Sequence, residues 1–165
     1  MQPPPNDQLI EPRVASAEIP ISAPVQMTLA ELQRIIEADS IRQLARFADA
    51  QPGFRSNLGD DNTFRHWDLM RRTGFNPTAQ LQAVLEEPYG TGKINGVTWY
   101  YWPYLAAYSS GRISTERITP VERADIVRLI GVTGLASLDG TKTYPGVRTA
   151  ISEDGTWHYF LHEPE

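Results

Sequence analysis

The segment 93–102, Lys-Ile-Asn-Gly-Val-Thr-Trp-Tyr-Tyr-Trp, constrains the fold more than any other part of the chain. Its Asn95-Gly96 pair lies between residues that favour strands. Asn-Gly is the strongest short-range signal for a β-hairpin, because both central residues of a type I′ turn need a positive φ. The outgoing strand is expected to end at Pro103, which has no backbone N–H to donate. We therefore expect an antiparallel strand pair here.

A second hairpin is expected near the C-terminus. Residues 147–151 and 157–161 are typical of strands, and the tetrapeptide Glu-Asp-Gly-Thr at 153–156 joins them. Strands joined by short turns pair in the antiparallel sense. The sequence thus predicts a small antiparallel sheet made of two β-hairpins.

Helical periodicity dominates the chain before the first hairpin. Thr28 and Glu31 form a capping-box pattern, which predicts a helix that begins at Thr28. The pair Asp39-Ser40 leaves two alternatives open, two short helices or one long helix with a kink. Residues 54–62 are expected to be a loop. Three more helices are expected: one with Phe64, Trp67 and Met70 on one face, one that opens at Asn76-Pro77, and one between the capping box Thr119–Glu122 and Gly131.

These elements predict an α+β fold in which an N-terminal helical cluster packs with the small sheet. A length of 165 residues fits one domain. Residues 1–26 contain six prolines and no periodicity, so we expect a largely disordered tail or tether, whereas residues 27–165 form a single globular domain.

Charge and composition exclude several classes of protein. The chain has 15 basic and 20 acidic residues and a net charge of −5, and Arg71-Arg72 is its only adjacent basic pair, so we expect no nucleic-acid partner. There is no cysteine, which removes disulfides, thiolate zinc sites and cysteine nucleophiles. No apolar run approaches the ~18 residues of a transmembrane helix, and no stretch is typical of a signal peptide.

The most unusual segment is 99–108, which holds six of the chain's aromatic residues. On a strand, Trp99 and Tyr101 point to one face of the sheet while Tyr100 and Trp102 point to the other. One pair belongs in the core. The other pair either lies under a helix or forms an exposed platform for sugar rings or Pro-rich peptides. The candidate ligand-binding residues are Trp99, Tyr100, Tyr101, Trp102, Tyr104, Trp157 and His66; Trp157 is expected to share a strand face with Tyr159.

No catalytic, metal or cofactor site emerges from the sequence. His158 and His162 are four apart on a predicted strand, hence on one face but about 13 Å apart, which is too far for one metal. His66 lies beside Trp67 on a predicted helix and is expected to pack there, with a general base as the alternative. The run Gly90-Thr-Gly-Lys93 lacks the first glycine and the Ser/Thr of a phosphate-binding loop, so no nucleotide site is predicted.

Four runs, residues 64–77, 87–90, 96–103 and 154–160, resemble uncharacterised domains of proteobacterial cell-envelope proteins. The resemblance spans residues 28–162. Such domains have no assigned activity, so it assigns a role to no residue. It implies a periplasmic or cell-envelope location.

Three functions remain open at this stage. The first is a non-catalytic envelope module that binds a cell-wall polymer or an envelope protein through the aromatic segment. The second is a carboxylate-based hydrolase of a glycan or small molecule, for which two acidic residues suffice and no motif is needed. The third is a cytoplasmic protein-partner or immunity-type factor, in keeping with the acidic balance.

Overall fold

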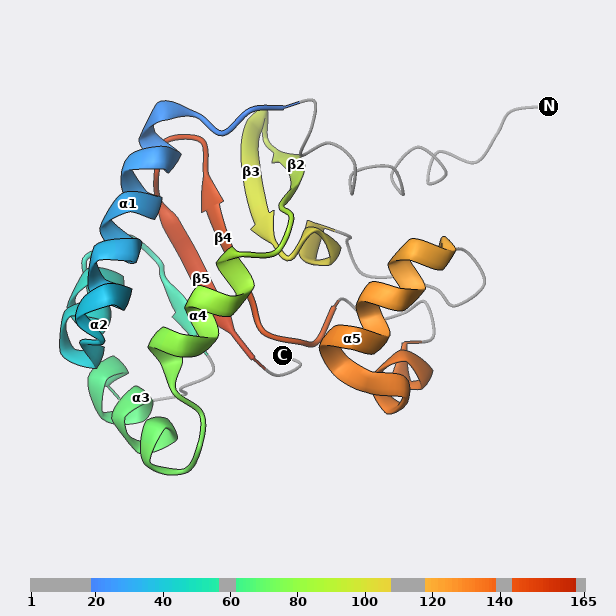
Figure 1. Ribbon diagram of the computed structural model, residues 1–165. Helices are drawn as coiled ribbons and strands as arrows, with labels where there is room; N and C mark the ends of the chain where they lie inside the picture. Colours follow the sequence, from blue (N-terminus) through green and yellow to red (C-terminus); the bar gives the residue numbers. More distant parts are fainter. Residues whose placement is uncertain (1–18, 57–61, 108–117, 139–143, 163–165) are drawn as a thin grey trace.

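A computed structural model describes residues 19–56, 62–107, 118–138 and 144–162 of the chain (Figure 1). The described elements are helices and strands in a mixed order. Along the chain they are α1 (Ala23–Ala38), α2 (Ile41–Asp49), β1 (Arg55–Ser56), α3 (Thr63–Arg72), α4 (Pro77–Leu85), β2 (Gly90–Ile94), β3 (Val97–Trp102), the 3₁₀ helix η2 (Tyr104–Ala107), α5 (Pro120–Ser137), β4 (Arg148–Ser152) and β5 (Trp157–Leu161). No helix among these residues is long and apolar enough to cross a bilayer.

The five strands form one sheet in the order β1-β5-β4-β3-β2. Both predicted hairpins are present, since β2 pairs with β3 and β4 pairs with β5 in the antiparallel sense. The α+β class is confirmed. The sheet is mixed, however, because Arg55 and Ser56 pair in parallel with β5 inside the predicted loop. Nothing in a two-residue strand gives a periodic signal, and its partner lies about a hundred residues away.

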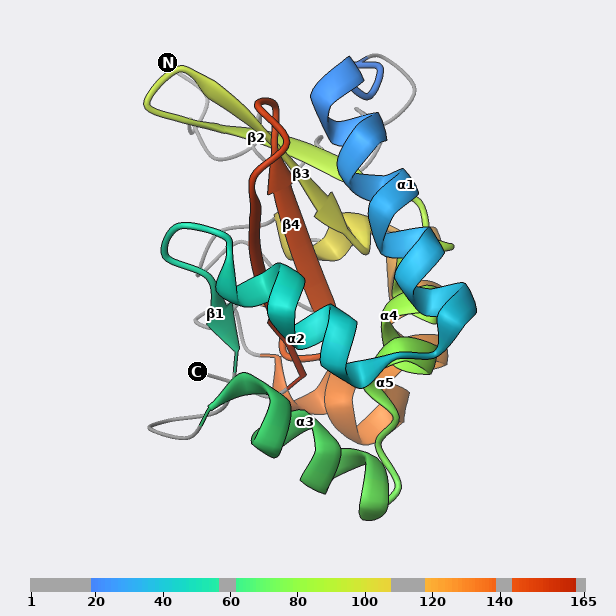
Figure 2. The same ribbon diagram turned by 90° about the vertical axis from the view of Figure 1, so that its left-hand side faces the viewer.

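Helices α1 to α4 cover one face of the sheet (Figures 1 and 2). The main core lies between these helices and the sheet, and it is built from buried side chains of both. Its largest fully buried side chains are Leu32, Ile35, Leu44, Trp67, Leu81, Ile151 and Trp157. Helix α5 lies apart from this layer and buries Ile126, Leu135 and Leu138 against η2 and Tyr144 in a second cluster. The molecule thus has a helix-covered face and an outer face of the sheet.

Helix α1 begins five residues before the predicted start. Ser22 is its N-cap and accepts a hydrogen bond from the N–H of Val25, with Pro24 in the first turn. Thr28 lies inside the helix, where its hydroxyl donates to the carbonyl of Gly155. The predicted Thr28 capping box is therefore wrong, because Ser22 and Pro24 supply an earlier start. Of the predicted tail, residues 1–18 lie outside the described residues.

Two other helix boundaries follow local backbone chemistry. Asp39 adopts a left-handed conformation with φ 50° and Ser40 caps α2, so the alternative with two helices is the correct one. The capping box of α5 is confirmed, with Thr119 and Glu122 each bonding the other's backbone N–H. The first helical segment of α5 ends at Gly131, as predicted, and a second segment follows it. Gly131 takes φ 80° and ψ 172°, a glycine conformation, and the helix resumes beyond the kink.

A β-bulge in β5 overturns two expectations about side-chain direction. The register shifts between Ala150 and Ile151, which leaves His158 as the extra residue on β5. Trp157 consequently packs in the main core, whereas Tyr159 packs on the outer face. Trp157 and Tyr159 do not share a face, and His158 and His162 lie on opposite faces. The alternation rule failed because a bulge adds one residue to the count.

Candidate functional site

Strand β3 divides the aromatic segment between the two faces of the sheet, as its alternation predicts. Tyr100 and Trp102 face the helices and are 3% and 2% exposed, while Trp99 and Tyr101 lie on the outer face and are half-buried. Tyr104 is buried beside α5. Tyr108, the last aromatic residue of the segment, lies outside the described residues.

The outer face carries a row of stacked rings. The ring of His158 lies against Trp99 with centroids 3.8 Å apart and planes inclined by 17°, and Tyr101 follows Trp99 at 6.1 Å and 27°. Each ring thus covers its neighbour. A flat aromatic platform needs an open ring face, and the ring of His158 covers one face of Trp99. Burial also raises the pKa of Tyr101, so its hydroxyl stays neutral.

Beneath this row, His158 belongs to a short polar chain. Its Nε2 is 2.7 Å from Ser152 Oγ, and Ser152 Oγ donates to Asp154 Oδ1 at 2.6 Å. A hydroxyl has one proton, so His158 donates to Ser152 through Nε2–H. Ser152 is 3% exposed and gives its proton to a carboxylate, which is the reverse of an activated nucleophile.

The pKa shifts of Asp154 and His158 in this polar network are typical of a turn with a structural role. Hydrogen bonds from Ser152 and from the N–H of Thr156 lower the pKa of Asp154. Burial lowers the pKa of His158, and the charge of Asp154 partly offsets that effect. The carboxylate stays ionised and the imidazole stays neutral near pH 7. These residues fix the β4–β5 turn and hold His158 against Trp99.

On the helix-facing side, Tyr89 completes an aromatic cluster with two residues of the sheet. Its ring centroid is 5.8 Å from that of Tyr100, at 61°, and 5.8 Å from that of Trp102, at 46°. Both of these ring contacts are tilted rather than stacked. Tyr89 is half-buried and lies over the nearly inaccessible Tyr100 and Trp102. It therefore supplies the accessible aromatic surface of this side.

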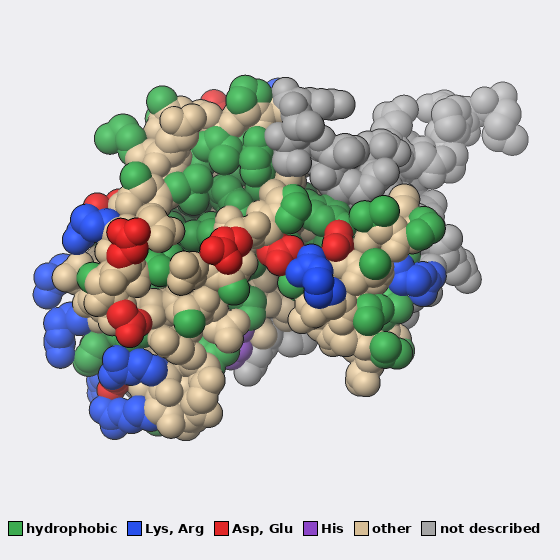
Figure 3. Space-filling model, in the orientation of Figure 1, with side chains coloured by type: hydrophobic (Ala, Val, Ile, Leu, Met, Phe, Trp, Pro, Cys, Tyr) green, Lys and Arg blue, Asp and Glu red, His purple; other side chains and the backbone are tan. Residues whose placement is uncertain are grey.

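Figure 3 shows a recess of apolar side chains between α1 and the β2–β3 hairpin, above α4. No charged side chain is drawn inside it. Ile21, Leu29 and Tyr89 are among the half-buried residues that pack against the main core. We call this recess the α1–β3 hollow. It offers an uncharged, apolar and aromatic surface.

A non-helical stretch of chain, residues 19–22, lies along the hollow. Tyr89 Oη donates to the carbonyl of Ile19 at 2.8 Å, and Tyr100 Oη donates to the carbonyl of Pro20 at 3.0 Å. Ser22 Oγ donates to the carbonyl of Glu153 at 2.8 Å. Burial, with a smaller effect of Tyr100, raises the pKa of Tyr89 and keeps its hydroxyl a donor. Two tyrosine hydroxyls thus hold the backbone of an Ile-Pro segment.

The remaining predicted site residues lie elsewhere. Trp157 is fully buried in the main core, where its Nε1–H donates to Thr149 Oγ1 at 2.7 Å. His66 is half-buried on α3, and its Nε2 has no hydrogen-bond partner among the described residues. Helix α3 is remote from β3 in Figure 1. The structure therefore brings neither residue to the hollow or to the outer-face row.

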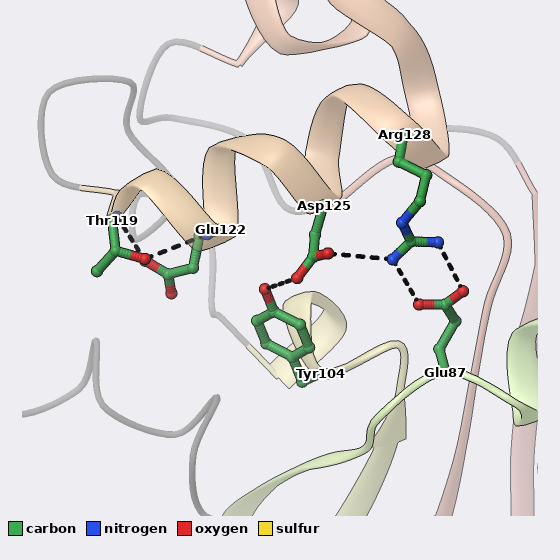
Figure 4. A network of polar contacts seen from close by, with 6 residues as sticks. All are labelled: Glu87, Tyr104, Thr119, Glu122, Asp125 and Arg128. Atoms are coloured by element: carbon green, nitrogen blue, oxygen red, sulfur yellow. Dashed lines mark hydrogen bonds and ion pairs between the residues drawn. The ribbon is translucent and has the colours of Figure 1, made fainter.

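The densest carboxylate cluster joins α5 to the rest of the molecule (Figure 4). Arg128 binds Glu87 through two hydrogen bonds of 2.8 Å and Asp125 through one of 3.1 Å, while Tyr104 Oη donates to Asp125 at 2.6 Å. The hydrogen bonds to Glu87 and then Asp125 raise the pKa of Arg128. Both carboxylates are thus neutralised by a fixed cation, and the described residues contain no metal-ligating group of acids and histidines.

Two hollows border this cluster: an open one of about 630 Å³ on α5 that Arg128 helps to line, and a small one. The small one measures about 120 Å³ between α4, α5 and the start of β4, and Glu87, Leu129 and Tyr144 are among its lining residues. Burial, with a smaller effect of Glu87, raises the pKa of Tyr144. Ligand pockets usually measure roughly 300–1,000 Å³, so this cavity does not hold a substrate of ordinary size.

Comparison of the chain with family models, with curated proteins and with solved structures found no match. The function is therefore argued from the residues themselves. The residue that sequence reasoning missed is Tyr89, which follows Pro88 outside the aromatic segment. Its only signal was its place in the run Glu-Pro-Tyr-Gly at 87–90, and that run does not indicate which side of the sheet Tyr89 covers.

Proposed function

We propose that this protein is a non-catalytic binding domain that takes an uncharged, apolar and extended segment of a partner protein in the α1–β3 hollow. The observation that carries the proposal is the pair of tyrosine hydroxyls that hold the carbonyls of Ile19 and Pro20 beside an apolar recess. The chain's own segment displays the chemistry that such a site accepts.

The ligand chemistry follows from the lining of the hollow. Apolar side chains of a partner would gain by leaving water, at roughly 25 cal/mol per Å² of buried surface. The half-buried ring of Tyr89 contributes an aromatic surface, which favours proline and branched aliphatic residues. A partner with charged groups at this point would lose hydration without gaining an opposite charge, because the hollow contains none in Figure 3.

Two observations favour this function over the alternatives. A sugar ring stacks on an open aromatic face, and on the outer face the ring of His158 already covers one face of Trp99. A hydrolase needs an acidic group with a raised pKa, whereas the hydrogen bonds at Asp154 lower its pKa and Glu87 is held by Arg128. Binding of a cell-wall polymer, or turnover of a hydrolase substrate, would therefore count against the proposal.

The proposed location is the cell envelope, which rests on the resemblance of four sequence runs to proteobacterial envelope domains. An envelope protein is then the expected partner. Cell fractionation of the source organism with an antibody against the chain tests this point. Recovery of the protein from the cytoplasmic fraction alone would favour the cytoplasmic partner-binding alternative.

The binding site is tested with a neutral, environment-sensitive dye, Nile red, followed by competition with a capped Ile-Pro-Ile-Ser peptide, the sequence of residues 19–22. We expect Nile red to bind and the peptide to displace it. The variant Tyr89→Ala should weaken dye binding at least tenfold, which corresponds to about 1.4 kcal/mol. The matched control Tyr101→Ala removes a half-buried tyrosine of the outer face and should leave binding unchanged.

Three results would overturn the proposal. Wild-type protein could fail to bind the dye and the peptide, Tyr101→Ala could weaken binding as much as Tyr89→Ala, or soluble cell-wall fragments could bind and the peptide not. Thermal unfolding of both variants shows that each is folded before its binding is compared.

A further inference from the structure

Two consecutive residues, Ile19 and Pro20, contact the sheet through their backbone carbonyls. The carbonyl of Ile19 accepts the hydroxyl of Tyr89 at 2.8 Å, and that of Pro20 accepts the hydroxyl of Tyr100 at 3.0 Å. Their side chains point away from the core, since the side chain of Ile19 is 36% exposed and Pro20 is exposed as well. We call residues 19–20 the strap.

The two residues that follow the strap belong to the folded structure. Ile21 packs against the main core, and its carbonyl accepts a hydrogen bond from Gln26 Nε2 at 3.1 Å. Ser22 caps α1 and also donates to the carbonyl of Glu153 in the β4–β5 turn. The chain is therefore anchored from Ile21 onward, and this anchorage does not depend on the strap.

The strap is held weakly in comparison with the rest of the chain. An intramolecular hydrogen bond contributes little net free energy where water can replace either partner. The exposed side chains of the strap bury little apolar surface, and segments of this kind open locally at a low cost in free energy. The strap can therefore leave the two tyrosines while α1 and the core stay folded.

We propose that the strap is a built-in competitor of the partner segment, which must displace it to bind in the α1–β3 hollow. This inference rests on the proposed function, because strap and partner would use the same two hydroxyls. A tyrosine hydroxyl has one proton to donate, so Tyr89 and Tyr100 each hold one carbonyl at a time. A partner segment prevails because its apolar side chains enter the hollow, whereas those of the strap remain exposed.

Pro20 sets how firmly the strap is closed. Its ring fixes its own φ, and it also restricts Ile19 to extended conformations. The released strap therefore has little conformational freedom to lose when it closes again. Pro20→Gly removes both restrictions and leaves both carbonyls in place, so it favours the open strap.

The affinity test uses the capped Ile-Pro-Ile-Ser peptide with full-length protein. The apparent affinity of a site falls with the fraction of molecules in which it is open, so Pro20→Gly should bind the peptide about threefold more tightly than the wild type. The matched control is Pro52→Gly, which changes an exposed proline in the turn after α2 and should leave the affinity unaltered.

The position of the strap is measured by the distance between two spin labels. The chain has no cysteine, so introduced cysteines carry the only labels. With labels at Ile19→Cys and at Lys93→Cys on β2, we expect a narrow distance distribution. It should broaden when Tyr89→Phe and Tyr100→Phe are added, and also with saturating peptide. The control pair Ala30→Cys and Lys93→Cys, between exposed positions of α1 and β2, should stay unchanged throughout.

The possible failures can be told apart. A peptide that binds while the distance from residue 19 stays the same, or that binds Pro20→Gly no more tightly than the wild type, overturns the strap and leaves the proposed function standing. A distribution that stays narrow in the variant with both phenylalanines overturns the strap without reference to any ligand. A peptide that binds neither the wild type nor Pro20→Gly overturns the proposed function, and the competitor with it.

Discussion

Replacing Thr149 by valine removes one hydroxyl from the floor of the main core. Thr149 is fully buried on β4, opposite Trp102 of β3. Its Oγ1 accepts the indole N–H of Trp157 at 2.7 Å and donates to the carbonyl of Tyr159 at 2.6 Å. Valine has nearly the same shape and makes neither bond, so both partners are left without this contact inside the core.

The magnitude follows from these two bonds. Each buried partner left unsatisfied costs about 1–3 kcal/mol. The added methyl group returns about 1 kcal/mol of hydrophobic stabilisation. We expect Thr149→Val to lower the free energy of unfolding by about 3 kcal/mol, and the melting temperature by about 9 °C for a chain of this size.

The assay is urea unfolding followed by tryptophan fluorescence, together with calorimetry. Thr149→Ser is the matched control, because it keeps the hydroxyl and loses one buried methyl, at a cost of about 1 kcal/mol. A valine variant as stable as the wild type, or a serine variant that loses as much as valine, would refute the reasoning. The double variant with Trp157→Phe should show that the two residues are coupled.

Three further perturbations test other parts of the structure. Because burial lowers the pKa of His158 below its ordinary value of 6.5, the unfolded chain binds a proton that the folded chain refuses. The free energy of unfolding should therefore fall as the pH drops below that value, and His158→Gln should flatten the profile measured by urea unfolding between neutral and mildly acidic pH. Gly131→Ala forces a side chain into φ 80° and ψ 172° and should cost about 2 kcal/mol in a thermal unfolding assay, whereas equal stability would contradict the kink in α5. Thr119→Ala removes half of the capping box and should cost about 1 kcal/mol, with Thr119→Ser close to wild type by the same assay.

Short sequence motifs predicted those turns and helix ends that depend only on a few consecutive residues. Asn95 and Gly96 both take positive φ in the β2–β3 turn, as the dipeptide indicates. The capping box at Thr119 and the break at Asp39 are likewise fixed by neighbouring residues. These features were within reach of the sequence because each depends on a few consecutive side chains.

Long-range packing decided the rest. The parallel pairing of β1 with β5 joins residues far apart in the chain. The bulge at His158 has no sequence mark, yet it reverses the direction of every later side chain on β5. The fully buried Val25 in the first turn of α1 is likewise a fact of tertiary structure.

Some features of the candidate site were likewise predictable from nearby residues, and others depended on the tertiary structure. Alternation on β3 predicted that Tyr100 and Trp102 share one face, and burial on that face could not be deduced from the strand alone. The row formed by Trp99, Tyr101 and His158 depends on the bulge. Tyr89 became part of the site only when the fold placed α1 opposite β3.

The central claim is that an apolar segment binds in the α1–β3 hollow, and a nuclear magnetic resonance titration of the full chain with the capped Ile-Pro-Ile-Ser peptide tests it most directly. We predict saturable shifts that centre on the rings of Tyr89 and Tyr100, whose hydroxyls hold the backbone of residues 19 and 20. Shifts centred on Trp99 and Tyr101 instead, or none at saturating peptide, would contradict the account.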